Sequence, residues 1–229
     1  MVVHGAAATW WQPRRGGWWV AVGFMVGAAL FALGSFPPYF RNVAPEADAV
    51  TFFIGSIFFT AAAAGQLTQA VREFVRIPAP RRHGWEPWSW GSQRLDLWAA
   101  IIQFLGTLFF NASTLRAIDL ALDTAQENRL VWRPDVFGSI AFLLASYLAI
   151  VSATGQRWSW SVRTRLERIA QANLAGSAAF GAAAICAYTL STTGNFVNLA
   201  IVNAGTFIGG ICFLVGAAWL IPLINTDPS

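Results

Sequence analysis

Carboxamide side chains lie well inside long apolar stretches of the chain, where few other groups could bind a ligand. They are Gln66, Gln103, Asn111, Asn173 and Asn203. A carboxamide both donates and accepts hydrogen bonds, so these residues could line a cavity for a small neutral solute. Amides within membrane helices more often hydrogen-bond a neighbouring helix. Helix pairing is therefore the default interpretation, and solute lining is the alternative.

Ionisable groups are missing from the middle of these apolar stretches. No Asp, Glu, Lys, Arg or His occurs there, although proton-coupled and ion-coupled transporters usually keep such a residue at membrane depth. The sequence also lacks a Walker loop, a metal-ligand motif and a credible Ser–His–Asp set. Cys186 and Cys212 fall within apolar stretches, where cysteine usually behaves as a small hydrophobic residue. We expect no catalytic residues, no cofactor, no metal site, no disulfide and no enzyme activity.

The composition points to a membrane protein. Hydrophobic residues make up 56% of the 229 residues and charged residues only 11%, whereas a soluble domain carries about 25% charged residues. About 20 apolar residues in a helix cross the hydrocarbon core of a bilayer. We predict an all-α integral membrane protein, a single membrane domain over residues 1–229 with six transmembrane helices. The spans are roughly 17–36, 49–71, 95–115, 134–154, 169–190 and 197–221.

The spans repeat in pairs. Gly27, Gly106 and Gly176 align, and each is followed four residues later by a phenylalanine: Phe31, Phe110 and Phe180. In the second span of each pair, Gly55, Gly138 and Gly205 align, each followed by Ser or Thr. We predict three parallel tandem helical hairpins, approximately 10–76, 88–157 and 158–222, arranged about a pseudo-threefold axis or in a row. Small residues at these positions would let helix backbones approach closely.

A cluster of tryptophan and arginine precedes each hairpin. Its members are Trp11, Arg15, Trp19, Trp90, Arg94, Trp98, Trp158 and Trp160. The first two sets have i, i+4, i+8 spacing, which places them on one face if they are helical. Tryptophan is enriched at membrane–water interfaces, so interfacial anchoring is the preferred interpretation. A cytoplasmic ligand platform or partner surface is the alternative.

The arginines give the orientation. Eleven of the 15 basic residues fall on the side of the N-terminal arm and the even-numbered connections, and four fall on the other side. Because cytoplasmic segments carry the excess of basic residues, both termini are predicted to be cytoplasmic, facing anionic lipid headgroups. Topology then explains the positive charge, and no nucleic-acid partner is expected. A periplasm-active reporter fused after Ser229 that gave a signal would refute this orientation.

The third connection, about 116–133, is longer than its equivalents. Leu115, Ile118, Leu122 and Leu130 follow a roughly helical spacing, with acidic residues between them. We predict that the third helix extends into the outer interface and that Pro134 begins the next helix.

Two stretches resemble the core of the YrhK-like domain, a short bacterial membrane hairpin. They are residues 52–59 (FFIGSIFF) and 105–114 (LGTLFFNAST). Residues 132–135 (WRPD), running into 137–139 (FGS), resemble longer members of that family. The resemblance covers most of the chain as tandem hairpins, and the third copy fits least well. It implies a bacterial inner-membrane protein, and it brings no established activity or catalytic residues.

These observations lead to two functional hypotheses. The first is a non-enzymatic, multi-pass plasma-membrane protein with a structural or accessory role, acting as a homo-oligomer or with a membrane-protein partner. The second is a channel or facilitator for a small neutral solute, which requires a continuous polar cavity. A membrane enzyme is the least favoured class, because the sequence offers no nucleophile–base pair.

Overall fold

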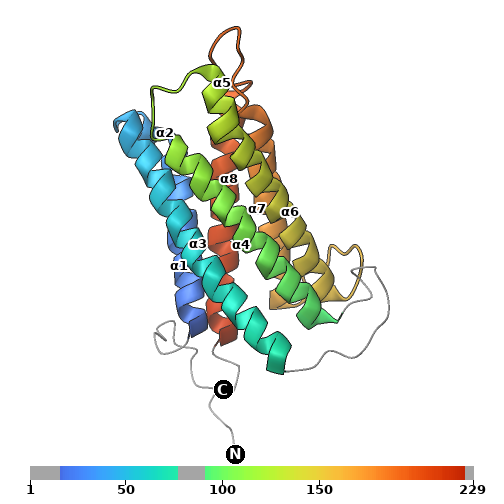
Figure 1. Cartoon of the computed structure of the whole chain (residues 1–229). Coiled ribbons are helices and arrows are strands. Elements are labelled where there is room, and N and C mark those ends of the chain that lie inside the picture. Colours follow the sequence, from blue (N-terminus) through green and yellow to red (C-terminus); the bar gives the residue numbers. More distant parts are fainter. Residues whose placement is uncertain (1–15, 77–90, 225–229) are drawn as a thin grey trace, which may run out of the picture.

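The computed structural model describes residues 16–76 and 91–224, most of which lie in long helices (Figure 1). The elements are α1 (Gly16–Gly34), α2 (Pro37–Phe40), α3 (Pro45–Arg76), α4 (Ser92–Arg116), α5 (Thr124–Glu127), the π-helix η2 (Asn128–Trp132), α6 (Arg133–Thr154), α7 (Arg165–Cys186) and α8 (Leu199–Ile224). Six helices are long and apolar enough to cross a membrane. The chain is therefore an all-α multi-pass membrane protein, as its sequence predicts.

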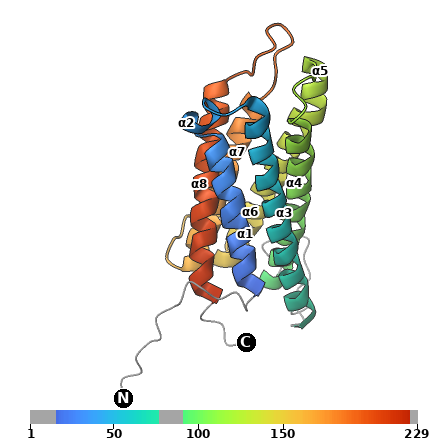
Figure 2. The same ribbon diagram turned by 90° about the vertical axis from the view of Figure 1, so that its left-hand side faces the viewer.

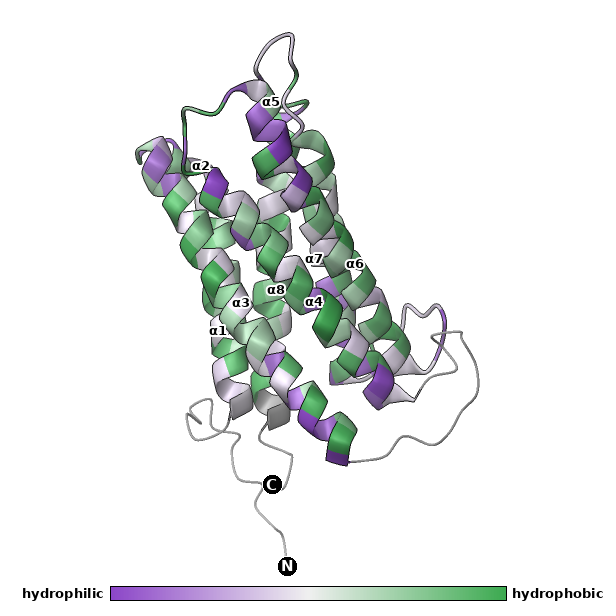
Figure 3. Cartoon of the chain, viewed as in Figure 1, coloured by the Kyte–Doolittle hydropathy of each residue, from purple (hydrophilic) through white to green (hydrophobic). Residues whose placement is uncertain are grey.

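The helices form because lipid leaves a backbone no other way to satisfy its hydrogen bonds. Neither α1 nor α8 contains a charged residue. Figure 3 shows hydrophobic residues along the middle of the bundle and hydrophilic ones gathered toward its two ends. The six helices coincide with the six predicted spans, and their ends differ from the prediction by a few residues, except that the fourth span begins ten residues earlier, at Thr124.

The six long helices close into a ring (Figures 1 and 2). Following the ring, α1 packs on α3, α3 on α4, α4 on α6, α6 on α7, α7 on α8, and α8 again on α1. Because α1 and α8 are in contact, the hairpins are not arranged in a row, which was one of the two predicted arrangements. The start of α1 and the finish of α8 lie at the same end of the bundle, which we call the terminal end.

Close contacts between glycine and phenylalanine recur in the ring. A methyl group built on Gly27 would lie 2.8 Å from the Phe59 ring, and one on Gly106 would lie 2.8 Å from the Phe142 ring. One on Gly176 would lie 3.1 Å from the Phe213 ring. The lack of a side chain lets each phenylalanine rest on the backbone of the facing helix.

The reciprocal contacts correct one predicted register. Gly55 faces Phe31 and Gly138 faces Phe110, but in α8 the residue that faces Phe180 is Gly209. The alignment of Gly205 with Gly55 and Gly138 was therefore wrong by one helical turn. Both glycines of the Gly205-x-x-x-Gly209 pair lie on the same face of α8, so the pattern alone could not distinguish them.

The connection at 116–133 also differs from its prediction. Helix α4 ends at Arg116, and the extension belongs to the fourth span instead of the third. The Asp123 side chain accepts a hydrogen bond from the backbone of Gln126, whose side chain bonds back in a capping box, so a new helix begins there.

Pro134 does not begin that helix, because the chain is already helical before it. A proline inside a helix clashes with the carbonyl four residues earlier. Here the preceding turn is the wider π-helix η2, in which the Arg133 N–H donates to the Asn128 carbonyl five residues back. The wider turn accommodates the proline without a break.

Candidate functional site

A cavity of about 720 Å³ lies between the helices at the terminal end, and all six long helices contribute to its lining. Ligand-binding pockets typically enclose about 300–1,000 Å³. The volume is therefore in the range of ligand-binding pockets, and the lining includes polar side chains.

Two neighbouring helices present matching rows of side chains to this cavity. On α4 the row is Asp96, Gln103 and Phe110; on α3 it is Glu73, Gln66 and Phe59. Members of each row are two helical turns apart, so they share a face and lie about 10 Å from one another along the axis. The acidic and amide residues line the cavity, and the phenylalanines lie beyond it. We call these the acid–amide–phenylalanine rows.

At mid-depth the cavity has a polar side and an apolar side. Gln66 from α3, Gln103 from α4 and Asn173 from α7 line it, as do Phe24 from α1 and Leu220 from α8. Three of the five predicted solute-lining amides are thus brought together. In the described part of the chain, none of these three side chains makes a hydrogen bond, so their polar groups are available to a ligand.

The remaining two amides lie outside this cavity. The Asn111 Nδ2 donates to Thr60 Oγ1 at 2.8 Å, which joins α4 to α3. Asn203 is half-buried in α8, toward the opposite end from the cavity. These two residues are not part of the candidate site.

Sequence reasoning missed the acidic residues of the rows. Asp96 was overlooked because it lies near the end of its span, and Glu73 lies just beyond the predicted end of its own. Asp96 and Ser152 on α6 both line the cavity, and the Ser152 Oγ donates to the Ser92 carbonyl oxygen at 3.4 Å. The seven-residue spacing between acid, amide and phenylalanine on both helices was the signal that could have revealed them.

Phenylalanines close the cavity at its deep end. One comes from each long helix, and we call the six together the phenylalanine plug: Phe31, Phe59, Phe110, Phe142, Phe180 and Phe213. All are buried, and the centroids of contacting rings lie 5.0 to 6.4 Å apart. Such edge-to-face and tilted contacts are favourable between aromatic rings. The cavity is therefore not continuous across the bundle, as the facilitator hypothesis required, but ends at the plug.

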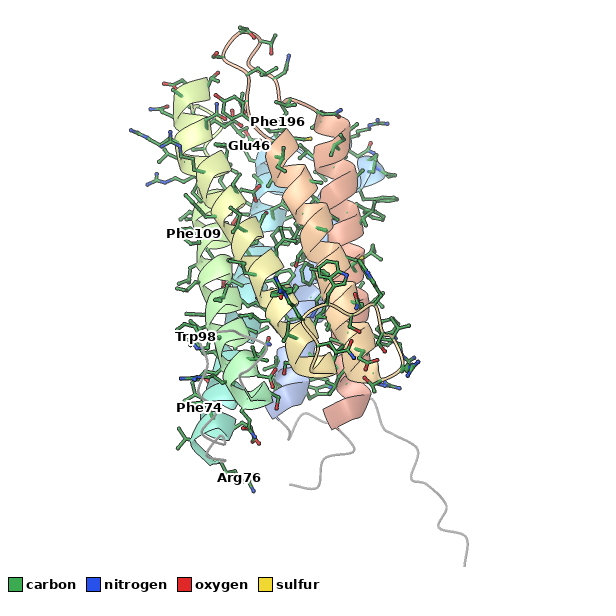
Figure 4. All side chains as sticks on the ribbon, turned by 90° about the vertical axis from the view of Figure 1, so that its right-hand side faces the viewer. Glu46, Phe74, Arg76, Trp98, Phe109 and Phe196 are labelled. Carbon is green, nitrogen blue, oxygen red and sulfur yellow. The ribbon has the colours of Figure 1, made fainter. Side chains whose placement is uncertain are left out.

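The predicted anchors that the structure describes lie on its outer surface. Trp19, Trp98, Trp158 and Trp160 are all exposed, and Trp98 lies with Phe109 along the outside of α4 (Figure 4). Arg94 lies one turn before Trp98 on the same helix, whereas Trp158 and Trp160 lie in the connection before α7. Trp11, Arg15 and Trp90 lie outside the described residues. Exposed indoles near one end of a bundle fit the interfacial interpretation.

Among the described residues, no group of three or more His, Cys, Asp and Glu side chains is placed to hold a metal ion. Cys186 and Cys212 are free. Comparisons with protein-family models, with curated proteins and with solved structures each found no match. The resemblance to the YrhK-like domain thus stays a prediction, and the case for function depends on the cavity.

Proposed function

We propose that this protein is a facilitator that takes a small polar solute into the cavity and passes it across the membrane when the phenylalanine plug opens. The observation that carries the proposal is the convergence of Gln66, Gln103 and Asn173 on one cavity. All three side chains are half-buried, face the same cavity and bond to no other described residue. A carboxamide both donates and accepts hydrogen bonds, so a polar solute that enters the cavity can bond to all three.

The contrast with Asn111 supports this interpretation. That amide pairs α4 with α3, which shows how the bundle uses an amide for helix association. Gln103 lies two turns further along the same helix and bonds to no described neighbour. Since the two amides share a helix and a chemistry, the difference between them lies in what they face.

We place the protein in the bacterial plasma membrane with both termini in the cytoplasm. The arginine distribution and the YrhK-like resemblance support this placement. The start of α1 and the finish of α8 share one end of the bundle with the cavity. The cavity then opens toward the cytoplasm, between anionic lipid headgroups that favour the arginine-rich side.

A structural or accessory role, alone or with a membrane-protein partner, is the second candidate function. It is favoured by the half of the bundle beyond the cavity, where Gly55, Gly138 and Gly209 pack directly on phenylalanines. Small-residue packing of this kind is what holds helices together in lipid. A pure scaffold, however, has no need of three unpaired amides around a cavity.

Solute flux into proteoliposomes tests the proposal. Urea and glycerol uptake is followed by stopped-flow light scattering after an osmotic step, with protein-free liposomes as the baseline. We expect uptake well above the baseline, and at least a tenfold reduction of that excess in the double variant Gln103→Leu, Asn173→Leu. The matched control is Asn203→Leu, which removes an amide outside the cavity and should retain the wild-type rate. Wild-type uptake equal to the baseline would favour the scaffold role.

A further inference from the structure

The charged side chains that line the cavity all carry the same sign. Glu73 on α3 and Asp96 on α4 are acidic, and no basic residue is among the described residues of the lining. The two helices pack against each other, so the two carboxylates share one side of the cavity mouth. A solute that enters on this side meets negative charge first.

On α7 the corresponding position is not charged. The α7 row runs from Leu166 through Asn173 to Phe180 at the same seven-residue spacing, so α7 carries Leu166 where α4 carries Asp96. Among the described lining residues, the acids thus lie on the α3–α4 side, where the two acid–amide–phenylalanine rows lie next to each other. This asymmetry gives an elongated solute a defined path along one wall.

Deeper in the cavity, the same rows offer groups that suit a cation bearing N–H bonds. The amide oxygens of Gln66 and Gln103 can accept hydrogen bonds from such a solute. At the deep end, Phe142 and Phe213 line the cavity. The face of an aromatic ring attracts a cation within about 6 Å of its centroid. From its mouth to its base, the cavity therefore offers a solute first carboxylates, then amide oxygens and then aromatic rings.

Arginines near the mouth do not reverse this preference. Arg72 and Arg76 flank Glu73 along α3, and Arg94 precedes Asp96 on α4, but none of the three lines the cavity. Exposed charges are screened over about 8–10 Å at physiological ionic strength. Glu73 and Asp96 line the cavity, so a solute inside it is closer to these carboxylates than to the arginines.

We infer that the solute is a small organic cation that carries N–H groups, an ammonium or guanidinium compound, and that Asp96 is the residue that selects it. This inference depends on the proposed function, because it names the solute class for the same cavity. The row on α3 supplies a second carboxylate, Glu73, nearer the mouth.

Guanidinium and urea form a matched pair for the test, because they share a planar shape and N–H donors and differ in charge. Uptake of each labelled compound into proteoliposomes is measured at equal concentration, with the membrane potential clamped at zero by valinomycin and potassium. We expect guanidinium to enter at least tenfold faster than urea, and acetate to enter at the baseline rate. Urea entering as fast as guanidinium would overturn the inference and leave the proposed function standing. Failure of both solutes to exceed the baseline would contradict the proposed function itself.

Variants then assign the selectivity to Asp96. Asp96→Asn keeps the size of the side chain and removes its charge, so the ratio of guanidinium to urea uptake should fall from above ten to near one. Asp96→Glu restores the charge and should restore most of the ratio, which separates selection from folding. The control Glu46→Gln neutralises an exposed acid at the far end of α3 and should keep the wild-type ratio. A ratio above ten in Asp96→Asn would show that this carboxylate does not select the solute.

Discussion

Buried hydroxyl groups join neighbouring helices at two places in the bundle. Ser56 Oγ and Thr114 Oγ1 lie 2.9 Å apart between α3 and α4. Ser146 Oγ and Ser177 Oγ lie 2.9 Å apart between α6 and α7, and Ser177 Oγ also donates to the Phe142 carbonyl. The Ser139 Oγ is equally buried but has no hydrogen-bonding partner among the described residues. At the scale of the residue, a hydroxyl joins two helices only where the facing helix supplies a second polar atom.

Replacing Ser139 by alanine should therefore not weaken the protein. An unsatisfied buried polar group costs about 1–3 kcal/mol, so Ser139→Ala should leave stability unchanged or raise it by up to about 1 kcal/mol. The matched variant Ser177→Ala removes an interhelical bond worth about 0.6 kcal/mol or more and should lower it. Thermal unfolding of both variants in the same nanodiscs makes the comparison. Ser139→Ala less stable than Ser177→Ala would contradict the argument.

At the scale of the element, the helices are held in register by glycines that face the neighbouring backbone. A methyl group built on Gly205 would lie 2.6 Å from the Ala179 carbonyl oxygen, whereas one on Gly181 would lie 3.4 Å from a Leu143 methyl. The first distance is a clash with rigid backbone, and the second is ordinary contact. Glycines in the same helical pair thus differ in what a side chain would meet.

Alanine at these two positions should have opposite effects. Gly205→Ala forces α7 and α8 apart, at a cost of about 1–3 kcal/mol. Gly181→Ala should be neutral or stabilising by about 0.5–1 kcal/mol, because alanine favours the helix more than glycine does. The unfolding temperature of each variant in identical nanodiscs measures both effects. Equal destabilisation by the two would show that helix separation does not depend on Gly205.

The spans themselves could be predicted because length and apolarity decide whether a segment crosses a membrane. Their register could not, since Gly205 and Gly209 satisfy the same pattern one turn apart. The assignment of residues 116–133 to the third helix was wrong for a related reason. Helical spacing of apolar residues shows that a segment is helical, but the capping box at Asp123 decides which helix it joins. The amides Gln66, Gln103 and Asn173 were identified correctly as polar, but apolar helices do not reveal which face turns away from lipid.

At the scale of the whole molecule, the phenylalanine plug separates the cavity at the terminal end from the closely packed region of the bundle beyond it. Phe213 is buried and lies on the cavity side of the plug, within 5.4 to 5.9 Å of the ring centroids of Phe180, Phe142 and Phe59. Because aromatic rings fill the centre of the ring of helices, solute passage requires them to move. The plug is therefore the element on which the barrier to flux depends.

Phe213→Ala should lower that barrier. Removing one ring from the plug leaves space next to the cavity, so urea uptake into proteoliposomes should rise severalfold above the wild-type rate. Phe109→Ala is the matched control, because Phe109 is exposed on the outside of α4 and packs on Phe137; it should retain the wild-type rate. The truncation should also cost about 3–5 kcal/mol of stability, which thermal unfolding checks. Unchanged uptake in a folded Phe213→Ala protein would place the barrier elsewhere.

The contact between α1 and α8 has a consequence for the order of the chain. Since these two helices are neighbours and Gly16 and Ile224 lie at the same end of the bundle, the ring has no unique starting point. A circularly permuted protein, with the native ends joined by a flexible linker and new ends opened in the exposed connection between α6 and α7, keeps every helix pair of the ring. Circular permutation is tolerated where the cut falls in an exposed loop. The fold then depends on the cyclic order of its helices and not on which of them is made first.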